Sequence, residues 1–298
     1  MLNVVGTVIA PVFAVAAIGA LVGHRLGFSI DTLSKAVFYL FSPALVFRYT
    51  STLQLEPGVI ARITVVCVVV FAANTLVAFL WSQARGHDHR TRAASMLTAA
   101  VANQGNLGLP VAKLAFGNAG LQVAVLVYVV GVTLWSSAGI AIGSVGHVDV
   151  RKAVLAPFRY PSIYAAIGGA LVNISNVNLP TIVEEPATEL AGAAIPVMLL
   201  VLGLQFSAHG GRELFEPAAW SLNRLVIGPL VAWPTVVLLG LDHVTGGTAI
   251  LMCGMPSAVM VIVLAAELGS RPDLAVRTVV VSTAMSIPTL SVLVWLVR

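Results

Sequence analysis

The stretch that decides the fold reads Asn103-Gln104-Gly105-Asn106-Leu107-Gly108-Leu109-Pro110, and it lies inside an otherwise apolar run. Two glycines and a proline interrupt a helix here, and three side-chain amides lie beside the interruption. A helix that faces lipid would not carry these residues, because backbone groups freed within a bilayer need partners inside the protein. The stretch therefore predicts a broken transmembrane helix whose polar break faces the interior of the molecule.

The composition places this break in a membrane protein. Of 298 residues, 58% are hydrophobic and 9% are charged, and the mean hydropathy is +0.97, whereas a soluble domain carries about 25% charged residues. One span with its connection takes about 30 residues, so the length allows roughly ten spans and excludes a separate soluble domain. The net charge of +4 does not indicate a nucleic-acid partner, since cytoplasmic loops set the sign in such a chain.

Ten apolar runs are separated by polar or glycine-rich connections. We expect spans at residues 3–23, 32–50, 58–83, 93–116, 121–143, 160–174, 187–207, 218–240, 248–267 and 275–297. The first run lacks the positive start and the short core of a signal peptide, so we interpret it as a span. The predicted fold is an all-α polytopic membrane protein with ten transmembrane helices.

Lysine and arginine mark every second connection. The connections between them carry no lysine or arginine, and only Arg298 at the C-terminus adds a positive charge on that side of the membrane. Because positive connections face the cytoplasm, we expect both termini to be extracytoplasmic in the plasma (inner) membrane. The nine basic residues that give this bias are Arg25, Arg85, Arg90, Arg92, Arg151, Lys152, Arg159, Arg212 and Arg271.

A second break, Gly254-Met255-Pro256-Ser257-Ala258, lies in the ninth run, and its proline follows Pro110 by 146 positions (256 − 110). Pro43 in the second run and Pro196 in the seventh are 153 positions apart (196 − 43). Five spans per half are an odd number, so the second half enters the membrane from the opposite side. The sequence predicts two inverted five-helix repeats with broken fourth and ninth spans. The expected units are residues 1–143 for the first repeat, 144–159 for a cytoplasmic linker and 160–298 for the second repeat.

Interrupted spans at corresponding positions of inverted halves indicate a transporter binding site near the bilayer midplane. A single break is weak support, because glycine and proline are common in transmembrane helices; the matched pair is what favours a site. Pro110 and Pro256 each suit the first turn of a half-helix, whose free amides bind carboxylates. The expected ligand is a small organic anion. Candidate binding residues are Asn103, Gln104, Asn106, Gly108, Pro110, Gly254, Met255, Pro256 and Ser257.

Four further residues are secondary candidates. Lys113 lies about one turn past Pro110 and either adds a positive charge to the site or extends to the outer surface. Asn74 and Gln205 either join the site or form hydrogen bonds between helices, and Pro43 belongs to the second matched pair of prolines.

Sites of other kinds are not indicated. No motif of a hydrolase, a metalloprotease or a phosphate-binding loop occurs in the chain, so we expect no enzyme activity and no cofactor. His87 and His89 flank Asp88, but a charged turn needs such residues for solvation, and we expect no metal. Cys67 and Cys253 lie in apolar runs, where a thiol acts as a small hydrophobe.

At these residues the chain resembles the auxin efflux carrier family, which contains plant auxin exporters and bacterial permeases proposed for malonate, malate and related acids. The resemblance implies the ten-helix fold of the bile-acid/sodium symporters, with spans one, two, six and seven in a panel domain and the other six in a core domain. It places substrate where spans four and nine cross, at Asn103, Asn106, Pro110 and Pro256. The segments that carry it are Ser42 to Phe47, Asn103 to Pro110, Pro196 to Gln205, Gly254 to Ala258 and Ser282 to Thr283.

The leading interpretation is a secondary active or facilitative carrier that moves an organic anion through the lipid bilayer by alternating access, in an elevator or rocking motion. The ninth span has Cys253-Gly254-Met255-Pro256 where the bile-acid branch carries acidic and amide residues, which argues against sodium coupling. The alternative functions that stay open are a sodium- or proton-coupled symporter, an anion channel, and a receptor that binds without flux. A homodimer formed through the panel domain is a further expectation.

Overall fold

The computed structural model describes residues 5–143, 150–206 and 214–298, and these residues form helices and connections without a named strand. Several neighbouring elements continue one another as a single rod, with π-helical turns at the joints. The elements are η1 (Val5–Ile9), α2 (Ala10–Leu26), α3 (Ile30–Ala36), η2 (Val37–Phe41), α4 (Ser42–Ser51), α5 (Pro57–Ala84), α6 (His89–Ala100), η3 (Gln104–Gly108), α7 (Leu109–Gly143), α8 (Val150–Leu155), η4 (Ala156–Arg159), α9 (Pro161–Ser175), α10 (Thr181–Phe206), α11 (Phe215–Leu222), η5 (Asn223–Ile227), α12 (Gly228–Leu238), α13 (His243–Cys253), α14 (Met260–Glu267) and α15 (Pro272–Val297).

Seven helical rods among the described residues are long and apolar enough to cross a bilayer, so the chain is a polytopic membrane protein. They are Val5–Gly23, Ile30–Ser51, Pro57–Ala84, Gln104–Gly139, Thr181–Gln205, Phe215–Leu238 and Pro272–Val297. Two apolar helices, α9 and α13, are shorter. The count is lower than the predicted ten because the fourth and ninth runs are broken, the sixth is short, and the fifth continues the fourth through a kink at Gly117, where φ is 66°.

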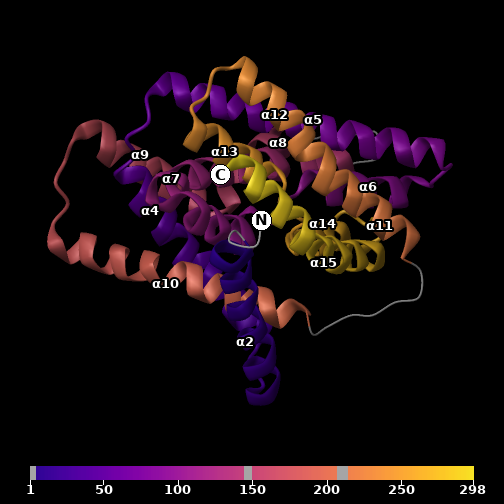
Figure 1. The fold of residues 1–298 in the computed structure, drawn as a ribbon, viewed down its shortest axis with the longest axis horizontal. Helices are drawn as coiled ribbons and strands as arrows, with labels where there is room; N and C mark the ends of the chain where they lie inside the picture. Colours follow the sequence, from indigo (N-terminus) through magenta and orange to yellow (C-terminus); the bar gives the residue numbers. More distant parts are fainter. Residues whose placement is uncertain (1–4, 144–149, 207–213) are drawn as a thin grey trace.

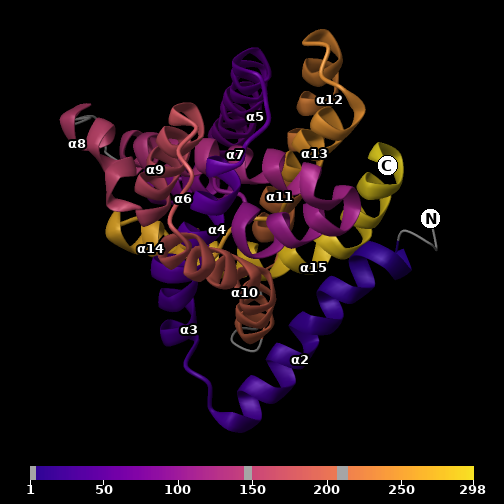
Figure 2. The same cartoon turned by 90° about the vertical axis from the view of Figure 1, so that its left-hand side faces the viewer.

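The helices pack in two groups. In one group α2 lies against α10, and α4 lies against both α9 and α10. In the other group α5 packs on α6 and α12, α13 packs on α7 and α12, and α15 packs on α11 and α14. Figure 1 shows α5 and α12 along one edge and α2 projecting from the opposite side, and in Figure 2 α2 and α3 form a V whose apex points away from the rest of the molecule.

Glycine allows the close approach of helices in the first group. A β-carbon on Gly203 would meet the backbone carbonyl of Ala16, and one on Gly169 would meet the backbone carbonyl of Phe47. Small residues at such contacts let helix backbones pack tightly where burial from water supplies little driving force. These two positions fix α10 against α2 and α9 against α4.

Two turns in the chain have nearly the same backbone. One joins α5 to α6 and the other joins α12 to α13, and in each the residue after the helix has φ −83° and ψ −2°. A glycine with positive φ follows, Gly86 at 65° and Gly240 at 60°. An aspartate with φ −63° and ψ 168° then caps the next helix, and Asp242 follows Asp88 by 154 positions (242 − 88).

Candidate substrate site where the two broken helices meet

Both predicted breaks are present. Helix α6 ends at Ala100, and the chain becomes helical again at Gln104. Helix α13 ends at Cys253, and α14 begins at Met260. The half-helices therefore begin at positions that differ from the prediction: η3 begins six residues before Pro110 and runs on into α7, and α14 begins four residues after Pro256.

The two broken segments satisfy each other's backbone. Freed amides and carbonyls inside a membrane protein need partners, and here residues far apart in sequence provide them. The pairing comprises an isolated antiparallel bridge between Ala102 and Ser257, a bond from the amide nitrogen of Asn103 to the carbonyl oxygen of Pro256 (2.7 Å), and a bond from the amide nitrogen of Ala258 to the carbonyl oxygen of Val101 (2.9 Å).

Ser257 takes part in this pairing with its side chain as well. It is fully buried, and its hydroxyl donates to the carbonyl oxygen of Thr98 at 2.8 Å. Its amide nitrogen donates to the hydroxyl oxygen of Ser282 at 3.2 Å. The donor of the Ser257 hydroxyl is thus used to close the end of α6.

A cavity of about 500 Å³ lies beside the pairing, between the two groups of helices. The polar side chains of Asn103, Gln104 and Asn106 line it, and Gln205 of α10 contributes from the other group. Its remaining walls include Ile30, Asp31, Ser34, Val37, Phe38, Ser42, Tyr128, Val132, Trp135, Tyr160, Ala258, Val259, Met260 and Val263. The structure thus gathers four of the predicted polar residues around one space.

The helix that begins at Gln104 presents unpaired amides to this cavity. No side chain caps it, and the amide nitrogens of Gly105 and Asn106, two residues that line the cavity, have no acceptor among the described residues. First-turn amides of this kind attract anions. The start of α14 differs, because the amides of Val261 and Ile262 already donate to the carbonyl oxygens of Ala258 and Val259.

Side-chain amides of the first break add donors and acceptors. Asn103 is 5% exposed, and among the described residues its side chain has no hydrogen-bond partner. The Gln104 side chain lies directly against Gly131 of α7, where a β-carbon would displace it. An amide can donate to a carboxylate and accept from a hydroxyl, so this wall suits a carboxylate that also carries a polar group.

Several predicted site residues do not line the cavity. Pro110 is buried within the continuous helix. Gly254, Met255, Pro256 and Ser257 are buried in the pairing, and Ala258, Val259 and Met260 form the wall from the ninth span instead. The wall on this side is therefore apolar, as the residue types of the second break indicate, but it lies further along the chain.

Gly108 has a packing role in this geometry. A β-carbon there would lie 2.9 Å from the sulfur of Met252 and 3.3 Å from Cγ of Met255. The absence of a side chain lets η3 approach α13 and the second break closely. Gly108 therefore positions the cavity wall without touching the cavity.

The secondary candidates lie in different environments. Lys113 is exposed and does not line the cavity, as a residue that extends to the surface would be. Asn74 is fully buried. Its side-chain nitrogen donates to the carbonyl oxygen of Val70 at 3.0 Å. The main-chain carbonyl oxygen of Asn74 accepts a bond from the Asn223 side chain at 3.1 Å. Pro43 is partly buried and lies next to Ser42, which lines the cavity.

Tyr160 lines the cavity and lies in the chain between η4 and α9. Its ring packs edge-on against Trp135 with ring centroids 4.9 Å apart. Its hydroxyl group can donate a hydrogen bond.

Arg224 is a residue that the sequence-based prediction missed. It lies in η5, is 2% exposed, and donates to the carbonyl oxygens of Ala99, Cys253 and Met255. The signal was present in the sequence, because an arginine within the run at 218–240 marks a functional position in a membrane protein. Its guanidinium group connects the ends of α6 and α13.

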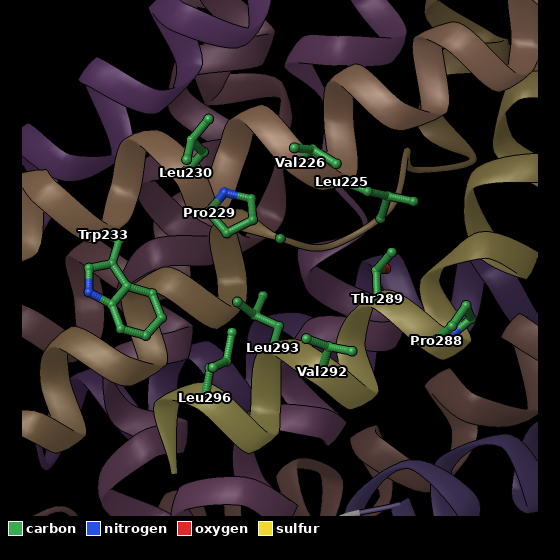
Figure 3. A pocket seen from close by; sticks show the side chains of 11 residues that line it. Leu225, Val226, Pro229, Leu230, Trp233, Pro288, Thr289, Val292, Leu293 and Leu296 are labelled. Atoms are coloured by element: carbon green, nitrogen blue, oxygen red, sulfur yellow. The ribbon is translucent and has the colours of Figure 1, made fainter. Parts of the chain in front are cut away.

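A second cavity of about 500 Å³ lies between α12 and α15. Figure 3 shows its wall of aliphatic side chains together with Trp233. Leu230 and Leu296 are 64% and 50% exposed there, which in a membrane-spanning segment means contact with lipid tails. With Thr289 as its one polar side chain among the described lining residues, this groove offers an anion little to bind.

Comparisons with known proteins place the chain. A protein from Methanothermobacter thermautotrophicus named "Uncharacterized transporter" is 29% identical over 265 residues, covering 87% of this chain and 86% of that protein. A protein from Rhizobium meliloti named "Putative malonate transporter" is 25% identical, covering 100% of this chain and 97% of that protein. Another "Uncharacterized transporter", from Methanocaldococcus jannaschii, is 22% identical over 89% of this chain and 88% of its own length.

The family model described as "Membrane transport protein" matches residues 4–294. This is a family of transporters and not of enzymes, and the match covers both breaks and the cavity between them. The chain belongs to the membrane transport protein family, which is the auxin efflux carrier family that the two broken segments predict.

Proposed function

We propose that this protein is a secondary carrier of small organic anions, with the cavity beside the two breaks as its substrate site. The observation that carries the proposal is the set of groups on one wall: the side-chain amides of Asn103, Gln104 and Asn106, together with the free first-turn amides of the same helix. These groups bind a carboxylate without a contacting cation. The apolar wall from Ala258 to Met260 suits the short carbon chain of such an acid.

A small dicarboxylate is the first substrate to test. The Rhizobium meliloti relative is named for malonate and aligns with the whole of this chain. One carboxylate would bind the amides of the first break, and Gln205 on the opposite wall would donate to the second. A cavity of about 500 Å³ accommodates such a ligand with water around it.

We infer that the chain forms ten transmembrane helices in two inverted repeats, residues 1–143 and 160–298. The matching turns at Asp88 and Asp242 support this inference, because their offset of 154 positions (242 − 88) is close to the offsets of the two matched proline pairs, 146 (256 − 110) and 153 (196 − 43). The antiparallel pairing of the two breaks supports it further, since equivalent segments of inverted halves run in opposite directions where they meet.

The two packing groups support a division into a panel domain and a core domain. Helices α2, α4, α9 and α10 would form the panel, and the group that contains both breaks would form the core. The cavity has walls from both, which is the position where relative movement of the domains would expose substrate to each side in turn. We therefore infer alternating access in an elevator or rocking motion.

The packing beyond the break favours a carrier over an anion channel. Leu107 of the first break, Met255 of the second break and Leu251 of α13 are fully buried and belong to one apolar cluster. A channel requires a continuous path for its ion, whereas a carrier keeps one side closed. Fully buried leucine and methionine side chains at the breaks therefore support a carrier rather than an open channel.

We propose that the cavity opens toward the cytoplasm of a cell whose plasma membrane holds the protein with both termini outside. Asp31 and Tyr160 line the cavity, and both follow connections that carry basic residues, Arg25 in one and Arg151 to Arg159 in the other. The positive-inside rule assigns those connections to the cytoplasm. The structure would then represent an inward-open state.

Uptake into proteoliposomes tests the proposal. Purified protein should take up labelled malonate in a saturable way and faster when the vesicles are preloaded with malonate, and the rate should be the same in sodium and choline buffers. Succinate, indole-3-acetate and acetate as competitors then define the substrate class. Flux that does not saturate would indicate a channel, and uptake that requires sodium would indicate a coupled symporter. Absence of uptake and of binding for every carboxylate would exclude the proposed function.

A further inference from the structure

Arg224 is a charged side chain at the centre of the molecule that the proposed carrier mechanism does not yet use. Its Nε atom donates to the carbonyl oxygen of Met255 at 3.0 Å. The Nη1 atom donates to the carbonyl oxygen of Ala99 at 3.2 Å, and the Nη2 atom donates to that of Cys253 at 2.9 Å. All three nitrogens of one guanidinium group are thus held by main-chain oxygens of the two broken spans.

The negative ends of two helices balance this charge. Ala99 lies in the last turn of α6, and Cys253 is the last residue of α13. Each helix end carries about half a negative charge, so the two ends together match one guanidinium group, which stays protonated in proteins. Among the described residues, no carboxylate forms an ion pair with Arg224.

We propose that the carbonyl oxygens of Ala99, Cys253 and Met255 form a cation-binding site that Arg224 fills permanently from within the chain. An ion supplied by the solution is then unnecessary to hold the two breaks together. Arg224 is a positioning residue, because it fixes the ends of α6 and α13 that shape the cavity without lining that cavity itself. Only the consequence for transport rests on the proposed function; the cation site does not.

A small space next to this site is a neighbour of the substrate cavity. A space of about 30 Å³ lies beside Arg224 and Cys253, and Gln104 and Trp135 line both this space and the substrate cavity. Truncation of the arginine to alanine would enlarge the space toward the three carbonyl oxygens. Free guanidinium presents its N–H groups in the same planar arrangement as the arginine side chain, so it fits where sodium, with its short bonds to oxygen, does not.

Thermal unfolding of purified full-length protein tests the site without any substrate. Arg224→Ala should lower Tm by roughly 10 °C, since it leaves buried carbonyl groups without a donor. Addition of about 50 mM guanidinium chloride should raise the Tm of this variant by about 4 °C. Sodium chloride or potassium chloride at the same concentration should give no such rise, and wild-type protein should gain nothing from guanidinium.

Arg62→Ala is the matched control. The Nη1 atom of Arg62 also donates to two carbonyl oxygens, those of Leu239 at 3.0 Å and Gly240 at 3.2 Å. Arg62 belongs to α5 and is partly exposed, and its side chain bonds to the turn between α12 and α13. Water can replace the bonds that are lost there. Guanidinium should therefore leave the Tm of Arg62→Ala unchanged, which separates occupation of the proposed site from a general effect of the salt.

Three results would overturn the proposal: an unchanged Tm in Arg224→Ala, no rise with guanidinium, or an equal rise with sodium. Arg224→Lys keeps the charge on a flexible stem, so it should fold with a Tm between those of wild type and Arg224→Gln. If Arg224→Ala yields no folded protein, the order of these two variants decides the question. A lysine variant no more stable than the glutamine variant would contradict a cation site.

Malonate uptake by the same proteins separates the two proposals. Wild type should transport without added cation, and Arg224→Ala should transport only when guanidinium is present. If wild type transports nothing while the thermal results hold, the proposed function fails and the cation site stands. If wild type transports and guanidinium stabilises none of the variants, the cation site fails and the proposed function stands.

Discussion

Asn103 is the residue at which we expect a substitution to affect recognition of the proposed substrate most. Its amide nitrogen is held by Pro256, which leaves its side chain in the cavity wall beside free main-chain donors. One residue thereby connects the pairing of the two breaks to the proposed substrate site. The proposed recognition role and the structural role of Asn103 use different atoms, so a substitution of the side chain separates them.

Asn103→Ala and Asn106→Ala should each weaken malonate binding about tenfold, because each removes a hydrogen bond to a charged group. The unfolding temperature should change little, since these side chains bond to no other described residue. Titration calorimetry and thermal unfolding check the two parts separately. Lys113→Gln, at an exposed position on the same helix, is the control and should bind like wild type. Unchanged affinity in both asparagine variants would contradict this site.

Gly108 should tolerate no side chain. Gly108→Ala places a methyl group 2.9 Å from the sulfur of buried Met252, and such overpacking costs about 2 kcal/mol. Gly58→Ala, where nothing lies within 4 Å, should have no comparable cost. Combining Gly108→Ala with Met252→Ala in a double-mutant cycle should show less destabilisation than the sum of the two single changes. Strict additivity would show that the two residues do not press on each other.

At the scale of the elements, the two similar turns stabilise the helices that lead into the breaks. Asp242 accepts hydrogen bonds from the amides of Val244 and Thr245, each at 3.0 Å, and Asp88 accepts one from Thr91 at 2.9 Å. Burial acts to raise the pKa of Asp242, but the hydrogen bonds from Thr245 and Val244 outweigh it and hold the pKa below its ordinary value of 3.8.

Because its pKa is lowered in the folded state, the Asp242 cap stabilises the protein less as the pH falls. Its contribution is complete above pH 3.8 and is lost as the pH falls through the lower value of the folded state. Asp242→Asn keeps a capping oxygen without the charge, so its unfolding temperature should fall less than that of wild type between pH 5 and pH 2.5. Asp242→Ala should lose about 1 kcal/mol at neutral pH. Parallel acid curves for wild type and Asp242→Asn would show that the carboxylate contributes nothing.

The sequence predicts the elements well where local chemistry decides them. Apolar runs mark the long helices, and the charged residues around Asp88 mark the turn between two of them. The amides of the first break mark one wall of the cavity. The start of the helix at Gln104 is not predictable in this way, because the backbone of Asn103 is set by a bond to Pro256, 153 positions away (256 − 103). For the same reason the ninth span lines the cavity with Val259 and Met260 and not with its proline.

At the scale of the whole molecule, the proposed orientation predicts from which side of the membrane the cavity between the two packing groups can be reached. Ser34 of α3 lines the cavity, and the native thiols Cys67 and Cys253 are only 6% and 3% exposed. A cysteine placed at Ser34 should therefore react with a thiol reagent, while the two buried native thiols should react little.

Ser34→Cys should react with a membrane-impermeant thiol reagent in inside-out vesicles and not in right-side-out vesicles. Lys113→Cys should show the opposite pattern, because Lys113 is exposed and lies near the end of the fourth span that the proposed topology places outside the cell. Mass spectrometry of the modified protein reports both. Labelling of Ser34→Cys from the outside alone would reverse the proposed orientation, and saturating malonate should slow its labelling if the cavity holds substrate.

The pairing of Ala102 with Ser257 has a consequence for how the protein is made. The first half of the chain enters the membrane long before its partner segment is synthesised. Until then, three carbonyl oxygens of the first half lack the donors that they have in the folded protein. The pairs are Thr98 with Ser257, Ala99 with Arg224, and Val101 with Ala258. Neither half on its own can complete its broken helix. Residues 1–149 and 150–298 expressed as separate chains should each be degraded, while their co-expression should restore both.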